Sequence, residues 1–186
     1  MRALLSSMSL LGALLTLPVF AQPQSVATSD AAPAAEARVA VSFVKPEKFT
    51  DATLQNRYKS YERVTKDLSD YLASLGQRYL PANQKLEIEV TDIDLAGRYE
   101  PWRNYNPDTR YMLDVTWPSV NLKYRLLEDG HEIAHGEQRV ADMNYLRRPV
   151  ARASADTLRY EKAMLDDWFR GHFDPQSKQA VAAHKP

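Results

Sequence analysis

The sequence predicts an α+β domain in which an antiparallel sheet carries one long helix after its first strand and a second helix at its C-terminal end. Three observations lead to this fold class. Several segments alternate apolar and polar residues, one long stretch repeats apolar residues every three or four positions, and one Asp-Gly pair is typical of a tight hairpin turn. The expected element order is β-α-β-β-β-β-α, a layer sandwich.

The chain of 186 residues divides into four expected parts. Residues 1–21 combine a single charge, an apolar run and a small-residue site, which predicts a secretory signal peptide cleaved near Ala21. Residues 22–37 and residues 175–186 are poor in large apolar side chains, so we expect a flexible leader and a disordered tail. Residues 38–174 are expected to form one domain.

The predicted signal peptide indicates export to the periplasm. Its apolar run is too short to cross a bilayer, so no membrane span is expected. The chain has no cysteine, which excludes disulfides, thiolate metal sites and a lipid attached through cysteine. The chain holds 24 basic and 24 acidic residues, and this balance argues against nucleic acid as a partner.

The first strand is expected over residues 39–44, because Pro46 cannot continue a strand in the interior of a sheet. Thr50 or Asp51 is then expected to cap the long helix. The apolar stripe of this helix consists of Leu54, Tyr58, Tyr61, Val64, Leu68, Tyr71, Leu72 and Leu75. Such spacing places one face of the helix against a core.

Four more strands are expected over residues 85–91, 110–117, 120–126 and 132–140. Asp129 and Gly130 join the last two as a two-residue turn. With such a turn, Leu126 is expected opposite Ile133. The final helix is predicted to start at a cap within residues 154–156 and to end at Gly171.

One motif is typical of an enzyme. His131, Glu132 and His135 match H-E-x-x-H, in which two histidines bind zinc and the glutamate is a general base. The motif needs a helix, where residues four apart lie about 5–6 Å from each other; in a strand they are roughly 13 Å apart. The preceding turn favours a strand. A small zinc-dependent hydrolase with His131 and His135 as ligands therefore stays an alternative. Glu161 could be proposed as a third ligand, but a solvated glutamate on the final helix is the ordinary explanation.

Other signs of catalysis or of a cofactor are weak. The six glycines are scattered and form no phosphate-binding loop, and no G-x-S-x-G pattern is present. Asp92 and Asp94 form a D-x-D pair after a strand, which could bind a divalent cation but more often caps a turn. We therefore assign no catalytic residue, no resident metal and no cofactor.

Two segments concentrate arginine together with aromatic residues, a composition typical of recognition surfaces. The alternative is that these arginines pair with nearby acids such as Glu100 and Asp108 and with the acidic strand at 85–91. The candidate binding residues are Arg98, Trp102, Arg103, Tyr105, Arg110, Arg147, Arg148 and Arg152.

Several separated motifs resemble domain-of-unknown-function family 3016. These motifs are Val41-Ser42-Phe43, Pro46, Phe49-Thr50-Asp51, Asp92-Ile93-Asp94-Leu95-Ala96-Gly97, Asp142-Met143-Asn144-Tyr145, Leu158-Arg159-Tyr160-Glu161-Lys162, Met164-Leu165 and Trp168-Phe169. The resemblance spans residues 41–169. It implies a small exported bacterial protein without an assigned activity, and it carries over no functional residues.

Together these features favour a non-enzymatic binding or interaction module of the cell envelope. Its partner would be an envelope protein or a small ligand. The zinc hydrolase is one alternative, and a structural envelope protein without a discrete site is another. The sequence leaves the oligomeric state open.

Overall fold

The computed structural model describes residues 37–54, 61–103 and 109–174. The predicted signal peptide, nearly all of the predicted leader and the predicted tail lie outside the described residues, as do Tyr58 and Tyr105.

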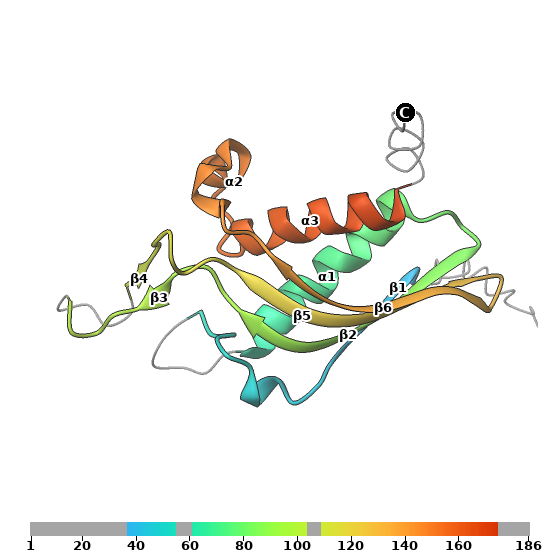
Figure 1. Cartoon of the computed structure of the whole chain (residues 1–186), viewed down its shortest axis with the longest axis horizontal. Coiled ribbons are helices and arrows are strands. Elements are labelled where there is room, and N and C mark those ends of the chain that lie inside the picture. The colour runs from blue at the N-terminus through green and yellow to red at the C-terminus, as the bar shows by residue number, and fades with distance from the viewer. Residues whose placement is uncertain (1–36, 55–60, 104–108, 175–186) are drawn as a thin grey trace, which may run out of the picture. The chain divides into compact units, whose positions relative to one another are not determined.

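A four-stranded sheet forms the centre of the fold (Figure 1). Its strands, in spatial order, are β1 (Val39–Phe43), β2 (Gln84–Asp94), β5 (Ser119–Glu128) and β6 (His131–Ala141). The α+β class is confirmed. The sheet differs from the expected one in two ways: β1 runs parallel to β2, and the segment expected as a strand over residues 110–117 is not part of it. The chain between β1 and β2 crosses back through a helix, and such a crossover returns the next strand in the same direction.

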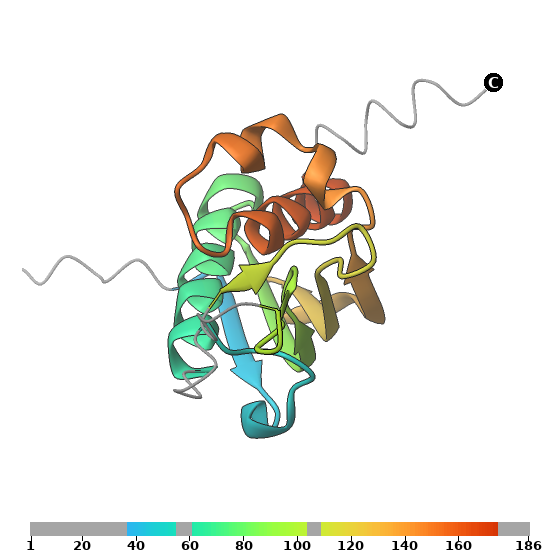
Figure 2. The same cartoon turned by 90° about the vertical axis from the view of Figure 1, so that its left-hand side faces the viewer.

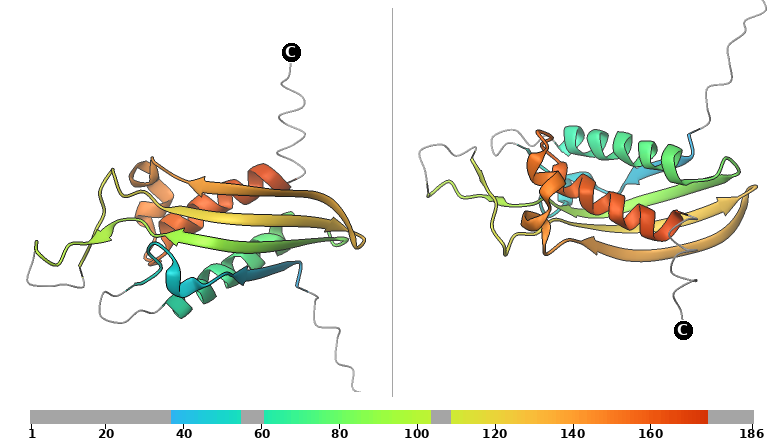
Figure 3. Two further views of the ribbon diagram at one scale, coloured as in Figure 1. Left: turned by 60° about the horizontal axis from the view of Figure 1, so that its bottom comes forward. Right: turned by 90° about the horizontal axis from the view of Figure 1, so that it is seen from above.

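Two long helices, α1 (Tyr61–Tyr79) and α3 (Arg159–Phe173), cover one face of the sheet and contact each other (Figure 3). None of the described long helices lies on the opposite face, which we call the helix-free face. The shorter elements are η1 (Pro46–Lys48), β3 (Arg98–Tyr99), β4 (Arg110–Tyr111), η2 (Tyr145–Arg147) and α2 (Pro149–Ala153). None of the described helices combines the length and the apolar character that a membrane crossing requires.

The core lies between the sheet and the two long helices. The alternation predicted for β2 is confirmed, since Leu86, Ile88 and Val90 are all buried. A β-bulge at Thr91 then shifts the register, so that Ile93 continues the buried row. The main contributors from α1 and α3 are Val64, Leu68, Leu72, Leu75, Met164, Leu165, Trp168, Phe169 and Phe173.

The hairpin between β5 and β6 is confirmed. Asp129 and Gly130 both have positive φ, 50° and 82°, as a two-residue turn that follows the twist of its strands requires. The expected register is wrong by one residue, because Ile133 is the extra residue of a β-bulge and Leu126 pairs with Ala134.

Two further expectations, for the start of the long helix and for the strand over residues 110–117, are wrong. Neither Thr50 nor Asp51 caps a helix, because residues 52–54 are not helical. Thr50 donates to the Asp92 carboxylate, whereas Asp51 forms a β-bridge with Asp94 and binds Arg110 through its carboxylate. The first described residue of α1 is Tyr61. The predicted strand over 110–117 is limited to β4, because Leu113 and Thr116 bond to each other and close a turn.

The end of the final helix also differs from the expectation. Gly171 lies within α3, which continues to Phe173. The Phe173 ring packs edge-on against Trp168 and Tyr124, at centroid distances of 5.3 and 5.6 Å. This burial extends the helix past a residue that often ends one. At the other end, the predicted cap within residues 154–156 is wrong: α3 begins at Arg159 with Leu158 before it, and the Asp156 carboxylate accepts the N–H of Leu158 in the turn that precedes the helix.

Candidate functional site

All the long connections of the second half of the chain leave the same end of the sheet. β2 ends at Asp94, β5 begins at Ser119 and β6 ends at Ala141, and the strand register places these residues side by side. Residues 95–118 and 142–158 therefore emerge together, and we call their described part the connection end. Figure 2 looks onto this end, with the α2 segment in orange above β3 and β4.

A second, smaller core makes the connection end rigid. The rings of Tyr145 and Tyr160 meet edge-on at 4.8 Å, and the Tyr145 hydroxyl donates to the carbonyl of Leu113 at 2.9 Å. The side chains of this core belong to Ala96, Met112, Trp117, Tyr145, Leu146, Ala151, Tyr160 and Ala163. The loop after β4 is thus fixed against α3 and can present its outer residues in a constant geometry.

Arg110, one of the predicted binding residues, uses its guanidinium for contacts within the protein. Its side chain is only 12% exposed, and its guanidinium lies 2.6 Å from the Asp51 carboxylate. It also donates to the carbonyl oxygens of Thr53, Leu95, Ala96 and Gly97. Arg110 therefore ties β4 to the sheet end.

Arg98 and Arg103 share one buried carboxylate. Glu100 is 5% exposed and accepts from Arg98 at 2.8 Å and from Arg103 at 3.1 Å. The Arg103 guanidinium also stacks over the Tyr111 ring, 5.0 Å from its centre. Both arginine side chains remain about half exposed, so each keeps donors for an external group.

The three arginines around α2 differ in their contacts. Arg148 bridges Asp142 and Asp167, which joins the end of β6 to α3. Arg147 and Arg152 are exposed, and their side chains have no partner among the described residues. Trp102, also predicted from the sequence, is 76% exposed.

Three apolar residues that the sequence reasoning did not select are exposed at the same end. Val115, Met143 and Val150 have exposed fractions of 71%, 68% and 85%, well above the 51% of Ile133 in the hairpin. Met143 and Val150 belong to no periodic pattern, and the alternation around Val115 predicts a strand rather than an exposed position. We call the following set the apolar–arginine surface: Arg98, Trp102, Arg103, Val115, Met143, Arg147, Val150 and Arg152.

The H-E-x-x-H residues lie in strand β6, as the hairpin pattern predicts. His131 follows the turn directly, and His135 bonds to Glu132 at 2.8 Å between exposed side chains. Glu161 is buried in α3, where it accepts the N–H of Ala96 at 2.7 Å. Among the described residues, no three His, Asp or Glu side chains are grouped so that they could hold a metal ion. The helix that the zinc alternative requires is not formed.

Asp92 has the role of a capping residue. Its carboxylate accepts the backbone N–H of Thr50 at 2.7 Å and the Thr50 hydroxyl at 2.9 Å. This fixes the turn after η1 against β2. Asp94, the second member of the pair, lies next to Asp51 through the β-bridge.

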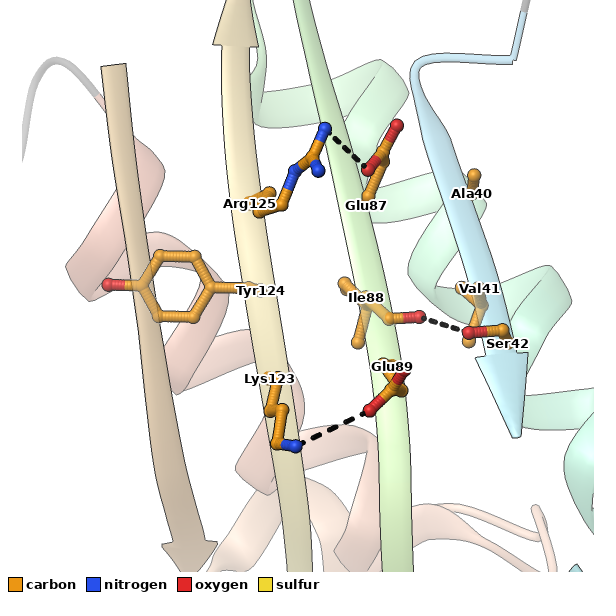
Figure 4. A pocket seen from close by; sticks show the side chains of 9 residues that line it. All are labelled: Ala40, Val41, Ser42, Glu87, Ile88, Glu89, Lys123, Tyr124 and Arg125. Atoms are coloured by element: carbon orange, nitrogen blue, oxygen red, sulfur yellow. Dashed lines mark hydrogen bonds and ion pairs between the residues drawn. The ribbon is translucent and has the colours of Figure 1, made fainter. Parts of the chain in front are cut away.

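The helix-free face of the sheet has a shallow hollow of about 440 Å³. Figure 4 shows two ion pairs across it, Glu87 with Arg125 at 3.3 Å and Glu89 with Lys123 at 3.7 Å. These charges neutralise each other across neighbouring strands, which is an ordinary way to stabilise an exposed sheet face. We therefore place the candidate site at the connection end.

Comparison with known protein families finds a match over residues 37–171 to the family described as "Protein of unknown function (DUF3016)". The chain belongs to this family. The resemblance seen in the sequence motifs is thereby confirmed. A search of curated proteins finds no match, and neither does a search of solved structures.

Proposed function

We propose that this DUF3016 protein is a non-enzymatic binding module of the cell envelope, exported to the periplasm, and that the apolar–arginine surface is its contact surface. The observation that carries the proposal is the exposure of Trp102, Val115, Met143 and Val150 at one end of the sheet, next to exposed arginines. Exposed apolar side chains gathered in one region and rimmed by polar groups are typical of interaction sites.

The charge of this surface favours an acidic partner. Glu100 is the shared partner of two arginines, and Arg147 and Arg152 have no carboxylate partner among the described residues. The surface therefore carries surplus positive charge. Complementary charge on a partner would speed association and select against basic surfaces.

Trp102 and Arg103 are the proposed centre of the contact. Both belong to the turn after Glu100, in which the N–H of Arg103 donates to the Glu100 carbonyl at 3.0 Å. The ion pair with Glu100 further restricts the Arg103 side chain. Tryptophan and arginine held in this way dominate binding energy at many interfaces, because little conformational entropy is lost when they bind.

The test compares two double variants by chemical crosslinking in the native cells, followed by mass spectrometry of the crosslinked species. The first variant combines Trp102→Ala with Arg103→Gln. The matched control combines Ile133→Ala with Arg125→Gln and likewise removes one exposed apolar side chain and one arginine, but from the β5–β6 hairpin.

We expect the wild type and the control to capture the same acidic protein, and the Trp102–Arg103 variant to capture at least about tenfold less. All three proteins should be fully folded at the temperature of the experiment, which thermal unfolding verifies. Equal capture by both variants would place the contact elsewhere. A wild type that captures nothing would favour the structural role instead.

A further inference from the structure

The connection end also contains a small polar hollow of about 280 Å³. It is lined by Asp51, Asp94, Gly97, Arg98, Val115, Thr116, Trp117 and Arg139. Its volume is close to the lower end of the range of roughly 300–1,000 Å³ for ligand pockets. The hollow therefore fits a small molecule better than a macromolecular segment.

The hollow contains a carboxylate without a partner. The two neighbouring carboxylates already have partners: Asp51 binds Arg110, and Asp92 accepts hydrogen bonds from Thr50. The Asp94 carboxylate forms no hydrogen bond and no ion pair within the described residues. Partial burial and the adjacent charge of Asp51 raise the pKa of Asp94. A cationic group placed beside Asp94 would relieve both effects.

The Arg139 guanidinium approaches the strand position next to Asp94 from the neighbouring strand β6. Arg139 lies on β6, and its Nη2 donates to the Ser119 hydroxyl at 3.2 Å. Ser119 is the strand partner of Asp94. Arg139 forms no ion pair within the described residues, and no direct contact joins it to Asp94. The two opposite charges thus face the hollow without neutralising each other by contact.

The rest of the wall includes two apolar side chains, Val115 and Trp117. Trp117 packs against the small core of the connection end, and Val115 lies two residues before it in the same loop. Gly97 holds this loop against the sheet, since its N–H donates to the Thr116 carbonyl at 2.9 Å. A ligand that bridges the two charges would have Trp117 and Val115 beside its uncharged part.

We propose that this hollow binds a small zwitterion of the α-amino acid class. Its ammonium group would lie on Asp94, its carboxylate on Arg139 with Arg98 nearby, and its side chain against Trp117. A simple cation would leave the Arg139 guanidinium without a carboxylate, and a simple anion would lie beside the carboxylates of Asp94 and Asp51. The inference does not depend on partner binding by the apolar–arginine surface.

The test is a titration followed by two-dimensional ¹H–¹⁵N NMR of the labelled full chain, with the Trp117 indole and Gly97 amide signals as reporters. The probes are glycine, L-leucine and L-phenylalanine, each compared with acetate and with methylamine. The variants are Asp94→Asn and Arg139→Gln. Glu137→Gln, on the same strand and face as Arg139, is the control, and Arg139→Lys tests whether positive charge suffices.

We expect saturable shifts of both reporters with at least one of the three amino acids, and weaker or absent shifts with the singly charged probes. Asp94→Asn and Arg139→Gln should each weaken binding at least about tenfold, whereas Glu137→Gln should leave it unchanged and Arg139→Lys should keep part of it. The proposal is overturned if none of the amino acids gives a saturable shift. It is equally overturned if acetate binds as well as the amino acids, or if the folded Asp94→Asn protein binds like the wild type.

Discussion

Arg110 and Asp51, 59 positions apart in the sequence, are joined by an ion pair of 2.6 Å at the end of the sheet. This contact connects the segment between η1 and α1 to strand β4. The guanidinium of Arg110 also binds the carbonyls of Leu95 and Gly97, so one side chain holds three separate segments together. These contacts of Arg110 position the segments that form the surfaces proposed for binding.

The first prediction concerns Arg110. Arg110→Met should lower the free energy of unfolding by about 3 kcal/mol or more, because it leaves the Asp51 carboxylate and several carbonyl groups without their donor. Urea unfolding followed by circular dichroism measures the change. Arg147→Met, at an exposed arginine, should change stability by less than about 0.5 kcal/mol. Equal effects of the two substitutions would contradict the structural role of Arg110.

The second prediction compares two glycines. A Cβ at Gly136 would lie 2.9 Å from the Tyr124 ring, and that ring is held by Trp168 and Phe173. Gly136→Ala should therefore destabilise the protein by about 1–3 kcal/mol.

The matched substitution is at Gly171, where an added Cβ meets nothing within 4 Å and the residue lies in a helix. Gly171→Ala should stabilise the protein by roughly 0.5–1 kcal/mol. Thermal unfolding of both variants measures the sign of each change in stability. A neutral Gly136→Ala would show that β6 does not pack on Tyr124 as described here.

The third prediction is a pH dependence. Burial raises the pKa of the Glu161 carboxyl, although the Ala96 N–H and the charges of Arg110 and Arg159 act in the opposite direction. The folded state then binds the proton more tightly than the unfolded state does. The stabilisation is fully present below the unfolded pKa and is lost as the pH rises through the folded pKa.

Glu161→Gln removes this titration and keeps an oxygen that can accept from Ala96. The difference in unfolding free energy between the variant and the wild type should therefore move in favour of the variant as the pH rises from acidic to neutral. Glu137→Gln, at an exposed strand position, is the control and should show no such trend. A constant difference for Glu161→Gln across this range would mean that Glu161 titrates normally.

Much of the fold could be predicted because its signals are local. The alternation in β2, the stripe of α1 and the Asp129-Gly130 turn each follow from residues close in sequence. The two β-bulges, at Thr91 and Ile133, have no such signal. Each is an extra residue that only the opposing strand defines, so the sequence predicts the strands but not their full register.

The candidate site shows the same division. Composition alone selected the arginines near the connection end. It could not distinguish the arginines that form internal ion pairs from those whose side chains are exposed. Arg110 forms an ion pair with Asp51, and Arg148 forms ion pairs with Asp142 and Asp167. None of these partners is a sequence neighbour of its arginine, so the sequence alone does not reveal the pairs. The exposed Val150 gave no signal either, because exposure depends on what packs beside it.

The most direct test of the proposed function is site-specific photocrosslinking in the native cells. A photoreactive amino acid replaces Trp102, Val150 or, as the control on the helix-free face, Lys123. We expect the first two positions to crosslink to the same acidic protein and Lys123 to form no such crosslink. Crosslinks from Lys123 alone, or different partners at Trp102 and Val150, would contradict a shared contact surface at the connection end.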